Sequence, residues 1–366
     1  MDKKLRVGIL GGTGMVGQRF ISLLEGHPWY EVTAIAASPR SAGKTYEEAI
    51  DGRWKMTKPM PEAVKKIIVQ DVRAVKEVAE QVDFVFSAVD MTKDEIRAIE
   101  EEYAKAEIPV VSNNSAHRWT PDVPMVVPEL NPEHFEVIAA QKKRLGTTRG
   151  FIAVKPNCSI QSYTPALTAL MRAGFMPEKV VATTYQAISG AGKTFKDWPE
   201  MEHNIIPFIG GEEEKSEKEP LRIWGHVENG EIVPAEGPVI TTQCIRVPVL
   251  DGHTAAVFVS FEEGKKPTKE QILKAWKEFS GLPQELELPS APKQFIRYLE
   301  EDDRPQVSLD VDYENGFGVS MGRLREDVIF DYKFVGLSHN TVRGAAGGAL
   351  LTAELLTAKK YITAKD

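Results

Sequence analysis

Residues 5–17 read Leu-Arg-Val-Gly-Ile-Leu-Gly-Gly-Thr-Gly-Met-Val-Gly, a short apolar run followed at once by a glycine-rich loop. Gly12, Gly14 and Gly17 fit the G-x-G-x-x-G pattern, in which glycine permits a tight turn and lets the backbone approach a pyrophosphate at the start of a helix. A helical pattern over residues 15–24 follows in the required order. The stretch predicts a dinucleotide-binding strand, loop and helix, although a plain tight turn also fits it.

The alternation of strand-like and helical segments continues to about residue 155. Short runs rich in Val and Ile alternate with longer segments of helical period, such as residues 94–105, which are rich in Glu, Ala and Lys. Such alternation is typical of a parallel sheet covered by helices. We therefore predict an α/β, Rossmann-type doubly wound domain with strands at residues 7–10, 32–37, 67–69, 84–89, 109–112 and 151–154.

Beyond residue 157 the pattern changes to long alternating runs with few helices between them. Alternation of apolar and polar residues indicates an antiparallel or mixed sheet with one wetter face. We predict an α+β domain with a mainly antiparallel mixed sheet, and strands at residues 180–188, 239–249, 254–261, 307–313 and 328–335. Residues 210–220, an acidic and basic run, are its least core-like segment.

The last segment, residues 340–361, is helical again, with Asn340 and Thr341 as a plausible cap. Its Ala- and Leu-rich turns suit a helix that covers a sheet, so we expect it to return to the first domain. The predicted division of the chain is residues 1–156 together with 340–366, and residues 157–339.

Length and composition limit the class of protein. A chain of 366 residues exceeds the roughly 250–300 residues at which single cores stop growing, so two domains are expected. Lys and Arg number 45 against 53 Asp and Glu, a formal charge of −8, which excludes a general cationic surface for nucleic acid or anionic lipid. Because the only cysteines are Cys158 and Cys244 and no apolar run is long enough to span a membrane, we predict a reduced, cytoplasmic protein without a Cys-based zinc site.

The end of the second predicted strand distinguishes the two nicotinamide cofactors. NAD-binding domains usually place Asp or Glu there to bind the ribose 2′-OH, whereas this chain has Ser38, Arg40 and Ser41. A cation and two hydroxyls suit a 2′-phosphate, so NADP is favoured. Arg40 is also compatible with a solvated loop residue.

Cys158 lies just after a predicted strand and just before a helical stretch, residues 162–173. The positive end of a helix lowers a thiol pKa, so this position suits a nucleophile, but free cysteines are also common packing residues and both interpretations stay open. His253, in a turn between two predicted strands, is a candidate base, and a structural histidine is equally compatible with its position. Cys244, inside an alternating strand, is expected to pack.

Several motifs occur in order along nearly the whole chain: residues 11–17, Ser-Asn-Asn-Ser-Ala-His-Arg at 112–118, Pro-Asn-Cys-Ser at 156–159, Tyr-Gln-Ala-Ile-Ser-Gly-Ala-Gly at 185–192, and Cys-Ile-Arg-Val-Pro at 244–248 followed by His253. Together they resemble the aspartate-semialdehyde dehydrogenase family, and Asp-Arg-Pro-Gln at 303–306 is similar to its archaeal and fungal branch. The resemblance implies an NADP-dependent enzyme that reversibly converts L-4-aspartyl phosphate to L-aspartate 4-semialdehyde and phosphate, in lysine, threonine and methionine biosynthesis. It also makes residues 157–339 the catalytic and dimerisation domain of a homodimer or homotetramer.

The same resemblance assigns roles to individual residues. Cys158 is implied as the acylated nucleophile, His253 as the general acid/base, and Gln186 as the group that orients the substrate. The implied substrate-binding residues are Arg246 for the carboxylate, Glu212 for the ammonium, Arg118 and Lys215 for the phosphate, and Asn114 and Ser115 beside it. The implied cofactor-binding residues are Gly11, Gly12, Thr13, Gly14, Met15, Val16, Ser38, Arg40, Ser41, Ser87, Ala88, Ser189, Gly190 and Asn340.

Some alternatives stay open from the sequence. Glu213 and Glu214 compete with Glu212 for the ammonium, and the whole run 212–218 is also compatible with a solvated charged surface. A malonyl-CoA reductase of the same superfamily would share the architecture and the thiol. A non-enzymatic NADP-binding regulatory protein would have the glycine loop with Cys158 as a packing residue.

Overall fold

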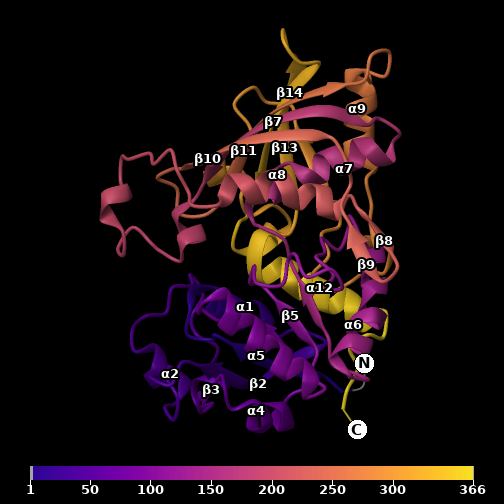
Figure 1. Ribbon diagram of the computed structural model, residues 1–366. Helices are drawn as coiled ribbons and strands as arrows, with labels where there is room; N and C mark the ends of the chain where they lie inside the picture. The colour runs from indigo at the N-terminus through magenta and orange to yellow at the C-terminus, as the bar shows by residue number, and fades with distance from the viewer. Residues whose placement is uncertain (1–2, 366) are drawn as a thin grey trace.

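The computed structural model describes residues 3–365 and has two lobes, one above the other in Figure 1. The lower lobe contains a six-stranded sheet in the order β3-β2-β1-β4-β5-β6 with every pair parallel. This strand order is that of dinucleotide-binding domains, and it confirms the Rossmann-type prediction. The strands are β1 (Leu5–Leu10), β2 (Tyr30–Ala37), β3 (Gln70–Asp71), β4 (Phe84–Ser87), β5 (Val110–Ser112) and β6 (Ile152–Val154).

Helices cover this sheet because each buries one apolar face against it. In α5 (Lys93–Lys105) a capping box of Thr92 and Glu95 starts the helix, and Ile96 and Ile99 lie on the buried face. Among residues 3–365, no helix is long and apolar enough to cross a membrane. The other helices of this lobe are α1 (Met15–Leu24), α2 (Tyr46–Ile50), α3 (Glu62–Lys65), α4 (Val75–Gln81) and α6 (Ile138–Leu145).

The upper lobe contains a mixed sheet in the order β10-β7-β11-β14-β13-β12. The pairs β7–β11, β11–β14 and β13–β14 are antiparallel, whereas β7–β10 and β12–β13 are parallel. This confirms the predicted mainly antiparallel mixed sheet. The strands are β7 (Pro177–Gln186), β10 (Val239–Arg246), β11 (His253–Phe261), β12 (Ile296–Leu299), β13 (Val319–Glu326) and β14 (Tyr332–Ser338), with a separate hairpin of β8 (His226–Glu228) and β9 (Glu231–Val233).

The C-terminal helix α12 (Gly347–Ala358) leaves the second sheet and returns to the first lobe, as predicted (Figure 1). Its residues 347–357 are buried on all sides, and Leu350 and Leu355 share a core with Leu5 and Phe20. The predicted cap at Asn340 is wrong: a π-helical turn, η6 (Val342–Ala346), precedes α12, and the Asn340 side chain instead bonds Gly252 N and Ser189 Oγ. The residue therefore joins two loops of the second lobe.

Several predicted elements of the second lobe are wrong. Residues 307–313 contain the short helix α11 (Val307–Asp310) rather than a strand, and β14 begins at Tyr332 rather than 328. The sequence analysis missed β12 and β13. It also missed α8 (Glu212–Ile223), which occupies the segment judged least core-like, and α9 (Lys269–Glu278). The remaining helices are α7 (Thr164–Arg172) and α10 (Leu282–Glu285).

Candidate active site

The ends of four strands bring the predicted catalytic residues together. Cys158 follows β6, at the carboxyl edge of the first sheet. Gln186 and Arg246 are the last residues of the parallel strands β7 and β10 and are partners in their register. His253 begins β11, which runs antiparallel to β7, so its first residue lies at the same edge. The fold therefore places one nucleophile candidate opposite three polar side chains.

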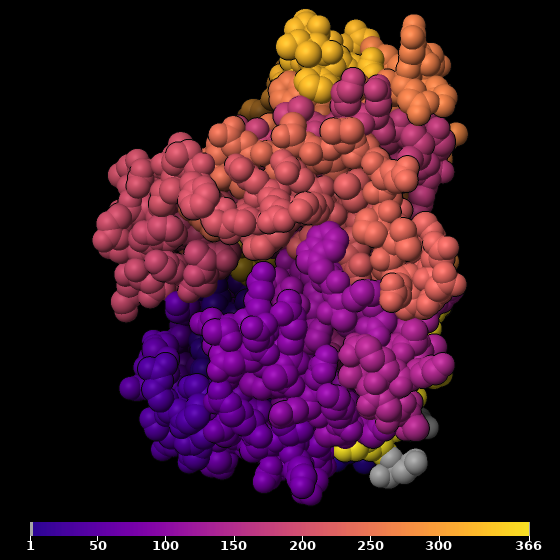
Figure 2. Space-filling model, viewed as in Figure 1, coloured from indigo at the N-terminus to yellow at the C-terminus, as the bar shows by residue number. Residues whose placement is uncertain are grey.

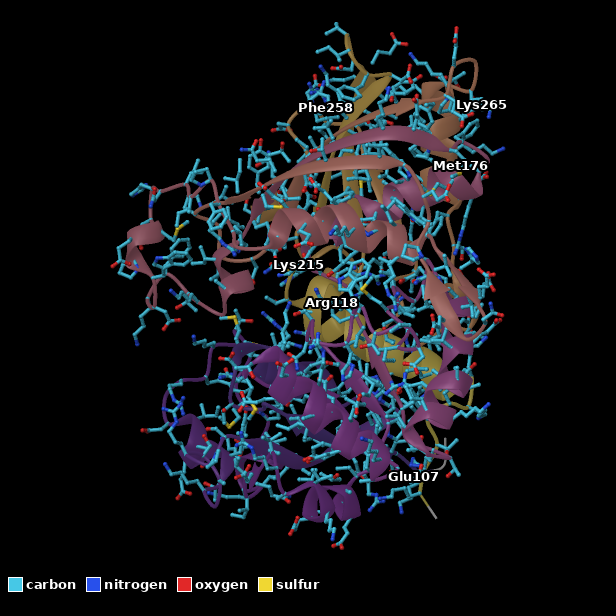
Figure 3. All side chains as sticks on the ribbon, in the orientation of Figure 1. Glu107, Arg118, Met176, Lys215, Phe258 and Lys265 are labelled. Atoms are coloured by element: carbon cyan, nitrogen blue, oxygen red, sulfur yellow. The ribbon has the colours of Figure 1, made fainter. Side chains whose placement is uncertain are left out.

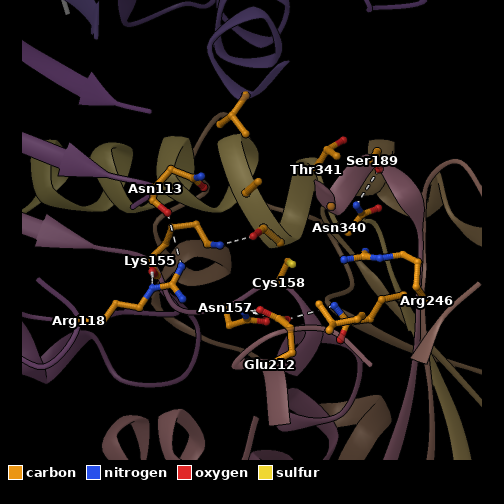
Figure 4. Close-up of a pocket in the computed structure, with 16 residues that line it drawn as sticks. Asn113, Arg118, Lys155, Asn157, Cys158, Ser189, Glu212, Arg246, Asn340 and Thr341 are labelled. Atoms are coloured by element: carbon orange, nitrogen blue, oxygen red, sulfur yellow. Dashed lines mark hydrogen bonds between the residues drawn. The ribbon is translucent and has the colours of Figure 1, made fainter. Parts of the chain in front are cut away.

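A pocket of about 220 Å³ lies at this junction (Figure 4). It is lined by predicted catalytic and substrate residues, namely Cys158, Gln186, Glu212, Arg246 and Arg118, and by Val16, Ser189, Gly190 and Asn340 from the predicted cofactor set. Asn157 also lines it, and so do Lys155 and Asn113, which were not predicted as site residues. Arg118 and Lys215 come from different lobes and lie where the lobes meet (Figure 3).

Cys158 and His253 are in contact, with 3.3 Å between Sγ and Nε2. The other ring nitrogen, Nδ1, accepts a hydrogen bond from the Ala187 backbone N–H at 3.0 Å. An acceptor at Nδ1 fixes the neutral ring with its proton on Nε2. His253 therefore directs an N–H toward the sulfur.

Burial dominates the titration of both groups. It raises the pKa of the Cys158 thiol, and Glu212 adds to the effect, while Lys155, Arg118 and Arg246 oppose it. Burial, helped by Arg246, lowers the pKa of His253 to about 3, so the ring is neutral at neutral pH. The expectation that a helix start lowers the thiol pKa is wrong here, because only the four-residue 3-10 turn η2 (Ser159–Ser162) follows Cys158 and desolvation outweighs its small dipole.

Glu212 begins α8 and is the member of the glutamate run that lines the pocket. Lys215 Nζ lies 2.8 Å from one carboxylate oxygen, and Asn157 Nδ2 and Gln186 Nε2 also donate to the carboxylate. Burial alone would raise the pKa of Glu212, but Lys215 and these donors hold it below its usual value. Glu213 instead accepts from Cys244 N, and Glu214 pairs with Lys218.

Arg118 is held by the carboxylate of Glu219, which was not predicted as a site residue. Glu219, 1% exposed, pairs with Arg118 at 2.9 Å and accepts the Asn157 backbone N–H. The guanidinium also donates to the carbonyl oxygens of Lys155 and Asn113. Arg118 is thus already neutralised by a buried partner.

Asn114 and Ser115, which were predicted to lie beside the phosphate pocket, do not line the pocket of Cys158. Asn114 Nδ2 donates to Ser87 Oγ at the end of β4 and to Glu100 Oε1 on α5. The preceding residue, Asn113, occupies the pocket wall.

A larger cleft of about 830 Å³ adjoins this pocket, and Val16 lines both. Figure 2 shows a hollow between the lobes at its position, beneath the overhanging segment near residues 190–210. Of the predicted cofactor residues, Thr13, Gly14, Met15, Val16 and Ala88 line the cleft. Residues 52–56 and the segment 191–197 also line it and were missed, and Lys55 joins them by an ion pair with Asp197 at 2.9 Å.

The glycine loop has no room for side chains. Gly11 has φ +83°, and a Cβ there would lie 2.3 Å from Ala88 O. A Cβ on Gly17 would lie 2.3 Å from Gly11 O. The backbone is therefore packed on itself and exposed on its cleft side, as a dinucleotide requires.

Six of the predicted cofactor residues line neither the cleft nor the pocket of Cys158: Gly11, Gly12, Ser38, Arg40, Ser41 and Ser87. Ser87 is fully buried, and its Oγ accepts from Asn114. Ser38, Arg40 and Ser41 lie in the turn after β2, where Ser41 N donates to Ser38 O and Arg40 is exposed. The Ser87 hydroxyl is thus held by Asn114, and its contact with the cofactor stays a prediction.

Two family models match the chain. The model described as "Semialdehyde dehydrogenase, NAD binding domain" matches residues 6–138, and "Semialdehyde dehydrogenase, dimerisation domain" matches residues 167–343. Together they cover both lobes.

Relatives and solved structures agree with these models. The aspartate-semialdehyde dehydrogenase of Methanothermobacter thermautotrophicus is 44% identical over 358 residues, 96% of this chain and 99% of that protein, and the Saccharomyces cerevisiae enzyme is 41% identical over 372 residues, 99% and 100%. The Candida albicans enzyme, solved with NADP, has a TM-score of 0.88 and 40% identity, with 98% of this chain and all of that chain covered. An aspartate-semialdehyde dehydrogenase II of Vibrio cholerae has a TM-score of 0.72 and 26% identity, with 97% and 99% covered. The chain therefore belongs to the aspartate-semialdehyde dehydrogenase family.

Proposed function

We propose that the protein catalyses the reversible, NADP-linked reductive dephosphorylation of L-4-aspartyl phosphate to L-aspartate 4-semialdehyde. The observation that carries the proposal is the 3.3 Å contact between Cys158 Sγ and His253 Nε2 in a pocket that adjoins the glycine-loop cleft. A thiol in this position can carry an acyl group next to a bound dinucleotide. The relatives and neighbours above carry the name of this activity.

NADP is the cofactor that suits the larger cleft. The tightly packed backbone of Gly11 and Gly17 leaves an open loop at the start of α1, and Thr13, Gly14 and Met15 form its wall. Anions bind well at such helix starts. The bound cofactor supplies the hydride that reduces the acyl group.

The protein's own residues carry out the acyl chemistry. The Cys158 thiol loses its proton to water, and the thiolate attacks the acyl carbon. The bond from that carbon to the phosphate oxygen breaks, the released phosphate takes up a proton, and a thioester on Cys158 remains. His253 Nε2–H donates to the sulfur and to the oxyanion that forms on the substrate. Gln186, whose Oε1 accepts from Thr184 and whose Nε2 donates to Glu212, is held ready to orient the acyl group.

Substrate recognition follows from the charges around the thiol. Arg246, 6% exposed, offers a guanidinium that can bind the α-carboxylate as a fork, with one nitrogen already anchored on Ala187 O. Glu212 can receive the substrate ammonium in competition with Lys215. A pocket of about 220 Å³ suits a small, doubly charged acyl phosphate.

An assay with two substrates tests the proposal against its nearest rivals. NADPH oxidation by the purified enzyme should be fast with aspartyl phosphate and slow with malonyl-CoA, since the small pocket supplies charge for the first substrate. A clear preference for malonyl-CoA would overturn the substrate assignment. If neither substrate is reduced while NADP binds and Cys158 alkylates slowly, the non-enzymatic alternative gains support.

Arg40 is the residue that we expect to select NADP over NAD. Its exposed position after β2 leaves the guanidinium available for the 2′-phosphate. Arg40→Ala should raise the KM for NADP about tenfold, the effect of losing one charge-assisted contact, and should leave the KM for NAD nearly unchanged. Equal changes for the two cofactors would show that Arg40 does not meet the 2′-phosphate.

The second lobe is also expected to form at least a homodimer. Strand β10 lies at the edge of its sheet, and Val239, Tyr185 and Leu250 are exposed apolar side chains on it or near its ends. Such surface is more often covered in an assembly than left in water. Light scattering should give a mass of two or four chains, and a mass of one chain, 40.6 kDa, at micromolar concentration would contradict the dimer.

The proposed chemistry needs a reduced thiol. Cys158 and Cys244 are both free, as a reducing compartment would keep them. We therefore place the enzyme in the cytoplasm. Cell fractionation that recovers it with exported marker proteins would refute this location.

A further inference from the structure

Glu219 is a buried carboxylate to which the mechanism above gives no role. It lies on the buried face of α8, is 1% exposed, and does not line the pocket of Cys158. Its two oxygen atoms have different partners: Oε1 accepts from Arg118 Nη1 at 2.9 Å, and Oε2 accepts the Asn157 backbone N–H at 2.5 Å. Figure 4 shows Arg118 and Asn157 on one side of Cys158 and Arg246 on the other. A side chain outside the pocket thus holds two residues that line it.

The contacts of Arg118, which was predicted as a phosphate ligand, leave room for an anion. A guanidinium has five N–H donors, one on Nε and two on each terminal nitrogen. Nε donates to Lys155 O at 3.0 Å, Nη1 to Glu219, and Nη2 to Asn113 O at 3.5 Å. Within residues 3–365, one N–H on each terminal nitrogen therefore stays available. The guanidinium is held on three sides and can still donate two hydrogen bonds to a phosphate in the pocket that it lines.

The charge of Glu219 and its position have opposite effects on a phosphate beside Arg118. Because the two side chains form a buried ion pair, their charges largely offset each other, so a phosphate gains little from the net charge of the pair. The direction of the available N–H groups then decides how well the phosphate is bound, since hydrogen bonds weaken steeply when they are misaligned. Glu219 sets this direction through its contact with Nη1.

The second contact of Glu219 relates the guanidinium to the nucleophile. Asn157 directly precedes Cys158, so a carboxylate that holds both Arg118 and the Asn157 N–H fixes the two groups relative to each other. In an acyl phosphate, one oxygen atom separates the acyl carbon from the phosphorus, so the sulfur and the phosphate ligand must keep a defined separation. We infer that Glu219 is a positioning residue that orients the Arg118 guanidinium, relative to Cys158, for binding of the phosphate. The inference rests on the proposed function and adds a residue to it.

The turn at Asn157 has further anchors that do not depend on Glu219. Asn157 Oδ1 accepts from Ser159 N at 2.8 Å and from Ser159 Oγ at 2.7 Å, and Asn157 Nδ2 donates to Glu212 at 3.0 Å. For Arg118, Glu219 is the acidic partner within the described residues 3–365. Loss of the Glu219 carboxylate should therefore displace the guanidinium more than the thiol.

Two substitutions change the charge and the reach of this side chain separately. Glu219→Gln keeps the size, removes the charge and leaves one acceptor oxygen for two donors. Glu219→Asp keeps the charge and both acceptors but is one methylene shorter. Glu278→Gln makes the same change as the first at an exposed position on α9 and is the control.

Three measurements separate phosphate binding from the chemistry of the thiol. Calorimetry gives the Kd for inorganic phosphate. Steady-state NADP reduction with aspartate semialdehyde gives kcat/KM for phosphate. The burst of NADPH formed without phosphate reports formation of the thioester, a step in which phosphate takes no part.

We expect the phosphate Kd to rise about tenfold in Glu219→Gln and about threefold in Glu219→Asp, with kcat/KM for phosphate falling by similar factors. The burst rate should fall less than about threefold, because Asn157 keeps its other hydrogen bonds. A carboxylate that only offset charge would give the opposite result: Glu219→Gln would lower the Kd, and Glu219→Asp would leave it unchanged. Glu278→Gln should match the wild type.

A double-mutant cycle tests whether the effect depends on Arg118. In the Arg118→Gln background, Glu219→Gln should change kcat/KM for phosphate less than about twofold, because no guanidinium is left to orient. A change as large as the one in the wild-type background would overturn the inference.

An unchanged or lower phosphate Kd in Glu219→Gln would also overturn the inference, whether or not the melting temperature falls. A burst that slows as much as the phosphate-dependent step would overturn it too, because Glu219 would then only support the turn at Asn157. If Glu219→Gln does not fold, Glu219→Asp provides the same comparison. A wild type without phosphate-dependent NADP reduction would refute the proposed function instead, and the phosphate Kd would still show whether Glu219 orients an anion-binding group.

Discussion

Cys158→Ala is expected to abolish phosphate-dependent NADP reduction, with a loss in kcat of at least about 10⁴-fold. The reason is chemical: a thioester needs a sulfur atom, and among residues 3–365 Cys158 is the cysteine that lines this pocket. Cofactor binding should persist, because Cys158 does not line the glycine-loop cleft, which shares the lining residue Val16 with the thiol pocket. Steady-state kinetics and NADP titration by fluorescence measure the two effects.

Cys244→Ala is the matched control. This thiol is buried in β10, 3.6 Å from Ser216 Oγ, and does not line the pocket. Its replacement should cost about 1 kcal/mol of folding stability and little activity. If Cys158→Ala retained more than about 1% of wild-type turnover, while the protein remained folded, covalent catalysis at Cys158 would be refuted.

Arg246→Leu is expected to lower kcat/KM for aspartate semialdehyde about 100- to 1000-fold, mainly through KM, because the variant loses a buried guanidinium that binds the α-carboxylate. Arg246→Lys should recover only part of this loss, since an ammonium cannot form the planar fork. Both effects follow from the position of Arg246 beside Gln186 at the end of two parallel strands.

A truncated substrate distinguishes recognition from general damage. The aldehyde 3-aminopropanal lacks the α-carboxylate of aspartate semialdehyde, so the wild type and Arg246→Leu should use it about equally well. If Arg246→Leu is equally impaired with both aldehydes, the side chain acts by holding Ala187 and the His253 loop rather than by binding the carboxylate.

The first lobe could be predicted from local pattern alone. The helix predicted at residues 15–24 is α1 to the residue, and five of the six strand segments overlap the observed strands, because parallel strands buried on both faces give continuous apolar runs. The return of α12 was also predictable, since a helix that is apolar on every side must be buried.

The second lobe shows where local pattern fails. Residues 307–313 alternate like a strand, yet Asp310 accepts from Arg297, Arg304 and the Gln306 backbone N–H and holds a helical turn, α11, with Leu309 60% exposed. The donors to the Asp310 carboxylate include residues of other elements. The alternating pattern of residues 307–313 therefore does not predict them.

The buried polar residues around Cys158 were the least predictable part of the site. Helix α8 turns Glu212, Ser216 and Glu219 inward at helical spacing, but its buried face is polar, so hydrophobic periodicity misses it. Glu219 pairs with Arg118, and the Lys155 amine donates to Gly344 O, and each of these partners is distant in sequence. Motif resemblance located Cys158, His253 and Arg246, whereas these supporting residues required the structure.

The central claim is that the acyl group resides on Cys158, and trapping it is the most direct measurement. The enzyme is mixed with aspartate semialdehyde and NADP without phosphate, quenched in acid, digested and analysed by mass spectrometry. We predict one aspartyl group on the peptide containing Cys158, formed with about one equivalent of NADPH and discharged when phosphate is added before the quench. Formation of NADPH with Cys158 unmodified, or with the aspartyl group on Cys244, would contradict the account.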